Sequence, residues 1–217
     1  WYVSSFRKML NNFTCFFLQN ESSQSLLKNI GFNNSIITGD TRFDRVFTIA
    51  QTTKDLPLIE KFKEHNLVMI LGSSWQPDEE LVLRYINETN HKLKLIIAPH
   101  EVSPENINRI FKGISSDKFL LKYSEANDAT ISNADVLLID SIGLLSSLYK
   151  YGNIAYIGGG FGKGIHNILE AATFGLPVIF GPNHEKFKEA TDLLMLGGAK
   201  IVSNYLYLKF LLDENFS

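Results

Sequence analysis

Short apolar segments alternate with amphipathic segments of about ten residues from Leu67 onward, and this alternation is what most constrains the fold. The expected strands are Leu67–Leu71, Leu93–Ala98, Phe119–Leu121, Val136–Ile139, Ile154–Ile157, Pro177–Phe180 and Ala199–Val202. The expected helices are Glu79–Asn90, Pro104–Lys112, Ser141–Tyr149, His166–Phe174, Lys186–Leu196 and Tyr205–Leu212. Apolar strands that alternate with helices are typical of a parallel sheet covered on both faces. The sequence therefore predicts an α/β domain with a Rossmann-like parallel sheet and helices on both faces.

The amino-terminal part of the chain follows a separate pattern. Its expected elements are a strand at Phe13–Leu18, a helix at Ser22–Ile30, a strand at Ser35–Thr38, and helices at Asp44–Gln51 and Leu58–His65. We interpret residues 1–40 as the end of a preceding domain and residues 41–57 as a connection. Residues 58–217 form the main domain, which we expect to continue past the carboxy end. Because the chain starts with Trp1 rather than Met, we expect it to be a fragment of a longer protein.

Composition excludes several classes of function. A net charge of −2 argues against nonspecific binding to nucleic acid, which needs a basic surface. The single cysteine, Cys15, rules out an internal disulfide framework and favours a reducing compartment. No apolar run approaches the roughly 18 residues of a membrane span, and no signal peptide is visible. We find no metal-ligand spacing and no Gly-x-Ser-x-Gly motif, so neither a metal centre nor a hydrolase nucleophile is indicated.

The most informative motif is the glycine-rich stretch between the strand ending at Ile157 and the helix expected from His166. Its glycines are Gly158, Gly159, Gly160, Gly162 and Gly164. Such a loop lets backbone N–H groups approach an anion, and a helix N-terminus adds free donors and a partial positive charge. His166 and Glu170 are four residues apart, so both can face one side of the first turn. The motif suits a nucleotide or nucleotide-sugar, although a turn that only packs a helix onto its sheet is the alternative.

Four other polar or glycine-bearing loops follow predicted strands. They are Gly72–Gln76, Pro99–Glu101, Asp140–Gly143 and Gly181–His184. In open α/β sheets, ligands bind beyond the carboxyl ends of the strands. With the glycine-rich loop, five such loops are expected to converge on one rim, which favours a site of nucleotide size over a set of helix caps.

A series of motifs in this order resembles a known family. The series consists of Ile37-Thr-Gly-Asp-Thr-Arg-Phe-Asp-Arg45, Gly72-Ser-Ser74, Val136-Leu-Leu-Ile-Asp-Ser-Ile-Gly143, Gly158–Ala172 and Gly175-Leu-Pro-Val-Ile-Phe-Gly-Pro182. It is similar, over nearly the whole chain, to the carboxy-terminal half of 3-deoxy-D-manno-octulosonic acid (Kdo) transferases.

The resemblance implies the two-domain GT-B glycosyltransferase architecture and a role in lipopolysaccharide biosynthesis. It implies that this half binds CMP-Kdo and that an amino-terminal domain binds the lipid A precursor. It also implies a metal-independent, inverting transfer with no cofactor. The general base would lie in the amino-terminal domain, so this chain would hold no catalytic residue. The full-length protein would work at the cytoplasmic face of the bacterial inner membrane, meeting the membrane surface, while this fragment would be soluble and inactive alone.

The resemblance also implies a set of donor-binding residues. These are Ser73, Ser74, Pro99, His100, Ile142, Gly143, Gly159, Gly160, Lys163, His166, Asn167 and Glu170. Within this set, Glu170 matches the acidic residue that binds ribose hydroxyls in GT-B donor domains. Two positions depart from the family pattern. His100 replaces an arginine of a Pro-Arg-His motif, and Ile142-Gly143-Leu144 replaces Met-Gly-Glu, so the departures affect side-chain contacts to the base.

Other interpretations stay open for single residues and for the whole chain. Glu170 could be a helix-dipole charge, His166 a cap residue, Lys163 a solvated charge, and Trp75 either a packing residue or a base-stacking residue. At the level of function, the alternatives are another GT-B enzyme, such as a UDP-sugar transferase or a UDP-sugar 2-epimerase, and a nucleotide-binding module without chemistry.

Overall fold

The computed structural model describes residues 2–216, which divide into two compact units, one up to Arg45 and one from Val46 onward. The smaller unit contains α1 (Tyr2–Leu10), β1 (Phe16–Leu18), α2 (Glu21–Asn29) and β2 (Ser35–Ile37). The predicted β-α-β order is therefore confirmed, whereas α1 was not expected. Helix α3 (Thr41–Thr52) begins in this unit and ends in the next, and α4 (Pro57–Lys63) follows it.

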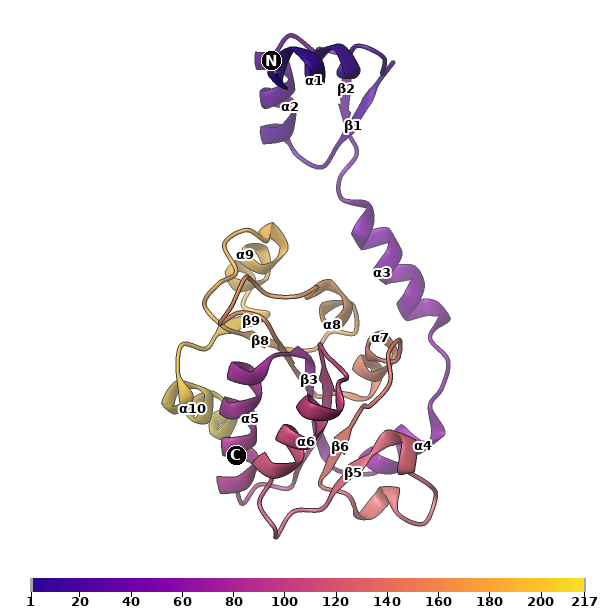
Figure 1. Ribbon diagram of the computed structural model, residues 1–217, viewed down its shortest axis with the longest axis vertical. Coiled ribbons are helices and arrows are strands. Elements are labelled where there is room, and N and C mark those ends of the chain that lie inside the picture. The colour runs from indigo at the N-terminus through magenta and orange to yellow at the C-terminus, as the bar shows by residue number, and fades with distance from the viewer. Residues whose placement is uncertain (1, 217) are drawn as a thin grey trace. The chain divides into compact units, whose positions relative to one another are not determined.

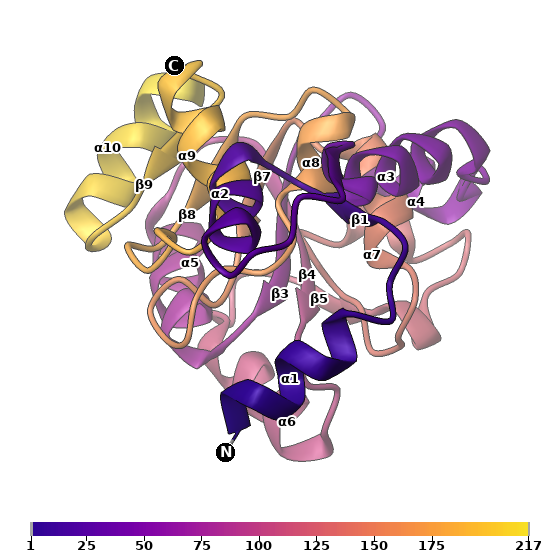
Figure 2. The same ribbon diagram turned by 90° about the horizontal axis from the view of Figure 1, so that it is seen from above.

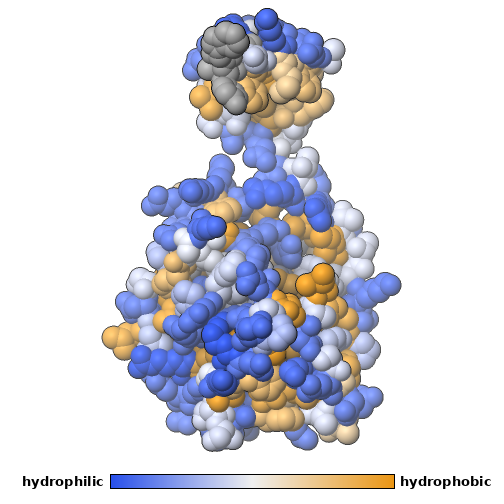
Figure 3. All heavy atoms as spheres, viewed as in Figure 1, coloured by the Kyte–Doolittle hydropathy of each residue, from blue (hydrophilic) through white to orange (hydrophobic). Residues whose placement is uncertain are grey.

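In the smaller unit, β1 and β2 pair in parallel, and Phe17 lies opposite Ile36 in the register. The side chain of Asn20 accepts a hydrogen bond from the backbone N–H of Ser23 and so caps α2. Phe17 and Ile36 both remain exposed, and Figure 3 shows apolar side chains on the surface of this smaller unit.

The larger unit contains a seven-stranded sheet in which every neighbouring pair of strands is parallel. Its strands are β3 (Leu67–Ser74), β4 (Leu93–Pro99), β5 (Leu120–Lys122), β6 (Val136–Leu138), β7 (Ile154–Ile157), β8 (Val178–Phe180) and β9 (Ala199–Ile201). The order across the sheet is β5-β6-β4-β3-β7-β8-β9. All seven predicted strands are thus confirmed within one or two residues, apart from β3, which runs three residues further.

Side chains of the strands alternate between two buried layers, as the period of a strand requires. In β3, Val68 and Ile70 pack in one layer, and Met69 and Leu71 pack in the other. The first layer includes residues of α4 and of three later helices, α7 (Leu145–Leu148), α8 (Leu169–Thr173) and α9 (Lys188–Met195). The second includes residues of α5 (Gln76–Glu88), α6 (Pro104–Gly113) and α10 (Tyr205–Phe216). Figures 1 and 2 show this arrangement, with α5 and α6 across the strands from α7 and α8.

Two helices are about half as long as predicted, and both begin late. The helix expected at Ser141–Tyr149 is reduced to α7, because Gly143 has a positive φ of 92° and breaks the helical path ahead of it. The helix expected at His166–Phe174 is reduced to α8, which begins only at Leu169. The side chain of Asn167 accepts a hydrogen bond from the Leu169 N–H at 3.1 Å, a local turn that competes with helix formation. His166 and Asn167 therefore precede the helix instead of opening it.

Candidate functional site

The order of the strands marks one crevice at the carboxyl edge of the sheet. The chain builds β4 and β6 on one side of β3 and then crosses to add β7 on the other side. Such a reversal of direction is the topological switch point at which open α/β sheets bind ligands. The loop from Ser73 to Trp75 and the glycine-rich loop leave β3 and β7 at this point, so both belong to the crevice.

The two loops approach each other closely enough to require glycine. A Cβ atom on Gly158 would lie 2.3 Å from the carbonyl oxygen of Ser73 and 2.6 Å from the Cα of Ser74. Ser73 itself has a left-handed φ of 50°, at the irregularity in the β3–β4 register. Non-glycine residues in this region are strained, and such strain is concentrated at functional sites.

The glycine-rich loop is also held from the side of β8. A Cβ atom on Gly160 would lie 2.5 Å from the backbone nitrogen of Gly181. Asn183 donates its backbone N–H to the carbonyl of Gly160 and its side-chain amide to the carbonyl of Gly162, both at 2.8 Å. The loop is therefore a fixed structure that neighbouring loops support on two sides. The role of Asn183 was not foreseen, since only its loop had been singled out.

A buried carboxylate joins the two main loops. Asp78, in the first turn of α5, is fully buried, and its Oδ2 accepts the N–H of Trp75 at 3.0 Å and that of Gly159 at 2.9 Å. Its Oδ1 accepts the hydroxyl of Tyr156 at 3.3 Å. Burial raises the pKa of Asp78 above its ordinary value, against the lowering effect of these hydrogen bonds. Asp78 is not among the residues predicted from the sequence to bind the donor.

Three aromatic rings form a cluster beside the glycine-rich loop. His100 stacks on Trp75 with ring centroids 4.5 Å apart and on His166 with centroids 4.4 Å apart. Trp75 and His166 lie side by side, and the indole Nε1–H donates to Nε2 of His166 at 3.0 Å. Burial, and secondarily the charge of His100, lowers the pKa of His166, which favours the neutral ring that this bond requires.

The ring cluster and the glycine-rich loop enclose a cavity of about 570 Å³. Its lining consists of Trp75, Pro77, Asp78, His100, Gly159, Phe161, Gly162, Lys163, Gly164 and His166. Sites for small molecules typically have volumes of about 300–1,000 Å³, so this cavity is large enough for a nucleotide. Four of the residues predicted to bind the donor line it, namely His100, Gly159, Lys163 and His166.

The remaining predicted residues are not part of the lining of this cavity. Ser73 and Ser74 end β3, Pro99 ends β4, and Gly160 lies in the glycine-rich loop. The hydroxyl of buried Ser74 donates to Glu79 at 2.8 Å, and Arg109 forms an ion pair with the same carboxylate. Ile142 is 89% exposed beside Gly143. Glu170 accepts a hydrogen bond from the side chain of Asn167 at 3.1 Å.

The loop offers donors for an anion. Among residues 2–216, the backbone N–H groups of Gly160, Phe161 and Lys163 have no intramolecular acceptor, whereas that of Gly159 is bonded to Asp78. Three free amides beside a lysine and two histidines can bind a phosphate or carboxylate. Across this same part of the chain, no cluster of three His, Cys, Asp or Glu residues is arranged to hold a metal ion.

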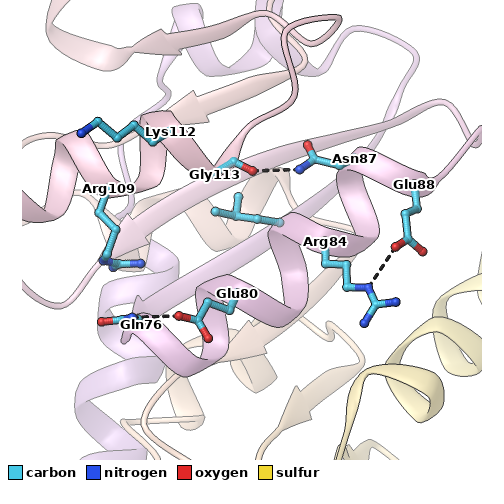
Figure 4. A pocket seen from close by; sticks show the side chains of 9 residues that line it. Gln76, Glu80, Arg84, Asn87, Glu88, Arg109, Lys112 and Gly113 are labelled. Carbon is cyan, nitrogen blue, oxygen red and sulfur yellow. Dashed lines mark hydrogen bonds and ion pairs between the residues drawn. The ribbon is translucent and has the colours of Figure 1, made fainter.

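A second hollow lies on the outer surface, between α5 and α6, with a volume of about 510 Å³ (Figure 4). Several of its polar side chains are already paired with one another. Gln76 donates to Glu80, Arg84 to Glu88, and Asn87 to the carbonyl of Gly113. These bonds connect residues of α5 or join α5 to the end of α6, so the hollow is less suited to a ligand than the cavity at the switch point.

Solved structures similar to this chain show its fold class. The C-terminal CMP-Kdo binding domain of WaaA from Acinetobacter baumannii matches with a TM-score of 0.59 and 20% identity, over 79% of this chain and 85% of that one. A proposed UDP-N-acetylglucosamine 2-epimerase from Listeria monocytogenes matches with a TM-score of 0.58 and 15% identity, over 89% of this chain and 48% of that one. The larger unit therefore has the fold of a Rossmann-like domain of GT-B glycosyltransferases, with a cavity at its switch point.

Curated relatives of similar sequence share one enzyme name. The chain is 25% identical over 199 residues to the 3-deoxy-D-manno-octulosonic acid transferase of Rickettsia typhi. The aligned region covers 90% of this chain and 42% of that protein. This chain is 29% identical over 191 residues to the enzyme of the same name from Aquifex aeolicus, covering 86% and 49%. No family model matches. The chain is thus a homologue of Kdo transferases over most of its length, and it spans less than half the length of these relatives.

Proposed function

We propose that this chain is the donor-binding part of a glycosyltransferase that transfers Kdo from CMP-Kdo to a lipid A precursor in lipopolysaccharide biosynthesis. The observation that carries the proposal is the homology to Kdo transferases over as much as 90% of the chain. The cavity at the switch point supports it, because its free amides, Lys163 and the imidazoles suit an anionic nucleotide-sugar.

The same proposal assigns a separate role to each domain of the whole protein. Residues 1–40 are the end of the acceptor domain, residues 41–57 the connection, and residues 58–217 the donor domain. The boundary between compact units at Arg45 and Val46 supports a division in this region. Transfer needs a base within about 2.6–3.2 Å of the acceptor hydroxyl, and we assign that base to the acceptor domain. This chain alone is then inactive.

The lipid acceptor brings the full-length protein to a membrane surface at the cytoplasmic face of the inner membrane. Among the described residues, no helix is long and apolar enough to cross a bilayer. We propose that the acceptor domain makes the contact with the membrane and that the donor domain supplies CMP-Kdo to it.

The experiment is a thermal-shift screen of this chain with CMP, CDP, UMP and UDP, followed by calorimetry. A ligand that binds only the folded state raises the melting temperature by mass action. We expect CMP to protect the chain and UMP to protect it less. Preferential protection by UMP or UDP would favour a UDP-sugar transferase or epimerase. Protection by CMP together with a full-length protein that transfers no Kdo would favour a non-catalytic nucleotide-binding module.

A further inference from the structure

Asp78 is a buried ionisable group to which the proposed function assigns no role. It is fully buried, lines the cavity, and accepts three hydrogen bonds. A buried carboxylate is costly unless such bonds compensate it.

The two shorter bonds join separate segments of the chain. One oxygen atom, Oδ2, accepts the backbone N–H groups of both Trp75 and Gly159. Asp78, in the first turn of α5, is 81 residues from Gly159 in sequence, and the two amides that it accepts come from the segments that follow β3 and β7. Trp75 is one of the three rings of the cluster, and Gly159 is the second residue of the glycine-rich loop. Two walls of the cavity are therefore fixed to a single acceptor atom.

The bond to Gly159 also determines which amides of the loop remain without an acceptor. Because the Gly159 N–H is directed at Asp78, the amides that lack an acceptor come after it in the loop, at Gly160, Phe161 and Lys163. Phe161, Gly162 and Lys163 line the cavity. Asp78 thus holds the start of this segment at Gly159, and Asn183 holds its carbonyl groups at Gly160 and Gly162.

We propose that Asp78 is a positioning residue for nucleotide binding, whose Oδ2 sets the spacing between Trp75 and the glycine-rich loop at which the cavity accepts the nucleotide. The inference rests on the proposed function. It assigns Asp78 no direct contact with the ligand.

The test compares three substitutions in the whole chain, in a Trp1→Phe background that leaves Trp75 as the only indole. Asp78→Ala removes the bridge and should weaken CMP binding about tenfold in calorimetry. Asp78→Asn keeps one carbonyl oxygen that can accept both amides, so it should restore CMP affinity to within about threefold of wild type. Tyr156→Phe is the matched control, since it removes only the bond to Oδ1, and it should leave CMP affinity unchanged.

Two further readouts follow the positions of the walls directly. In Asp78→Ala, the emission maximum of Trp75 should shift and the Gly159 amide should exchange with solvent faster, while both stay at wild-type values in Tyr156→Phe. In the wild type, the Gly159 amide should exchange as slowly as amides of the central strands, despite its place in a loop. This last measurement tests the bond between the Gly159 amide and Asp78 even when Asp78→Ala does not fold.

The outcomes separate this inference from the proposed function. Equal CMP affinity in Asp78→Ala and wild type, or rapid exchange of the wild-type Gly159 amide, would overturn the positioning role and leave CMP binding intact. Absence of CMP binding by the wild type, with a protected Gly159 amide that Asp78→Ala releases, would overturn the proposed function and leave the bridge established. Weak binding by both Asp78→Ala and Asp78→Asn would show that the charge, rather than the bridging oxygen, is required, and would also overturn the inference.

Discussion

The indole N–H of Trp75 donates to Nε2 of His166 at 3.0 Å, across 91 residues of sequence. His100 stacks on both rings, so the three side chains form one wall of the cavity. A protonated imidazole has no acceptor nitrogen, and the bond therefore requires neutral His166.

Because this bond needs the neutral ring, the stability that depends on it should decrease in mildly acidic solution. The pKa of His166 is lowered in the folded state, so the unfolded chain binds more protons between that pKa and the ordinary value of 6.5. The stabilisation is complete above about pH 6.5 and is lost as pH falls through the folded pKa. Urea unfolding of wild type and His166→Gln between pH 5 and 8 measures it, and we expect the difference in unfolding free energy to decrease toward acid. Parallel curves would contradict the assignment.

Asp78 should show the opposite dependence on pH. Its pKa is raised in the folded state above the ordinary value of 3.8, so the folded protein binds more protons in the window between the two values. Its contribution to stability is greatest below pH 3.8 and is lost as pH rises through the folded pKa. Relative to Asp78→Asn, the wild type should therefore lose unfolding free energy as pH rises. A constant difference in unfolding free energy across this range would show that the pKa of Asp78 is not raised in the folded protein.

The glycines of the loop should differ sharply in their tolerance of alanine. In Gly158→Ala the new methyl group would meet the backbone of Ser73 and Ser74, and we expect a loss of at least about 1–3 kcal/mol of unfolding free energy. Gly162→Ala is the matched control, because its Cβ would lie 3.6 Å from the nearest atom, the carbonyl oxygen of Gly159. Chemical denaturation of the two variants tests this, and equal losses would refute the close approach of the loops.

Glu170→Gln tests the role that the resemblance implies for this carboxylate. If Glu170 binds ribose hydroxyls, each charge-assisted bond is worth roughly 1.5–3 kcal/mol, and the substitution should weaken CMP binding about tenfold or more. Glu105→Gln, at an exposed position in the first turn of α6, serves as the control. Unchanged CMP affinity in calorimetry would reduce Glu170 to a helix-dipole charge and a partner of Asn167.

The sheet was predictable because its strands are largely apolar. The segments at Leu67, Leu93 and Ile154 contain β-branched and aliphatic residues bounded by polar loops, which identifies buried parallel strands by composition alone. Their order in the sequence also indicated the crevice, since loops after parallel strands meet at one edge.

The details of the site were less predictable, because they depend on contacts between distant residues. Nothing near Asp78 in the sequence indicates that Gly159 and Tyr156 will bond to it. The late start of α8 has a local cause in Asn167, but a pattern of apolar spacing cannot distinguish a helical residue from one whose side chain accepts a backbone amide. The side-by-side contact of Trp75 and His166 likewise arises only when β3 and β7 pair.

The pairing of β3 with β7 also has a kinetic consequence. The backbone N–H of Val68 donates to the side chain of Asn153, 85 residues further along the chain, so this junction closes a long loop. Contacts of such large sequence separation form slowly, because the entropy of loop closure is lost before they contribute. A partly folded chain with only β3, β4 and β6 in place would have one half of the crevice. The capacity to hold a nucleotide should therefore emerge at a late stage of folding, which makes ligand binding a direct measure of how much of a preparation has folded completely.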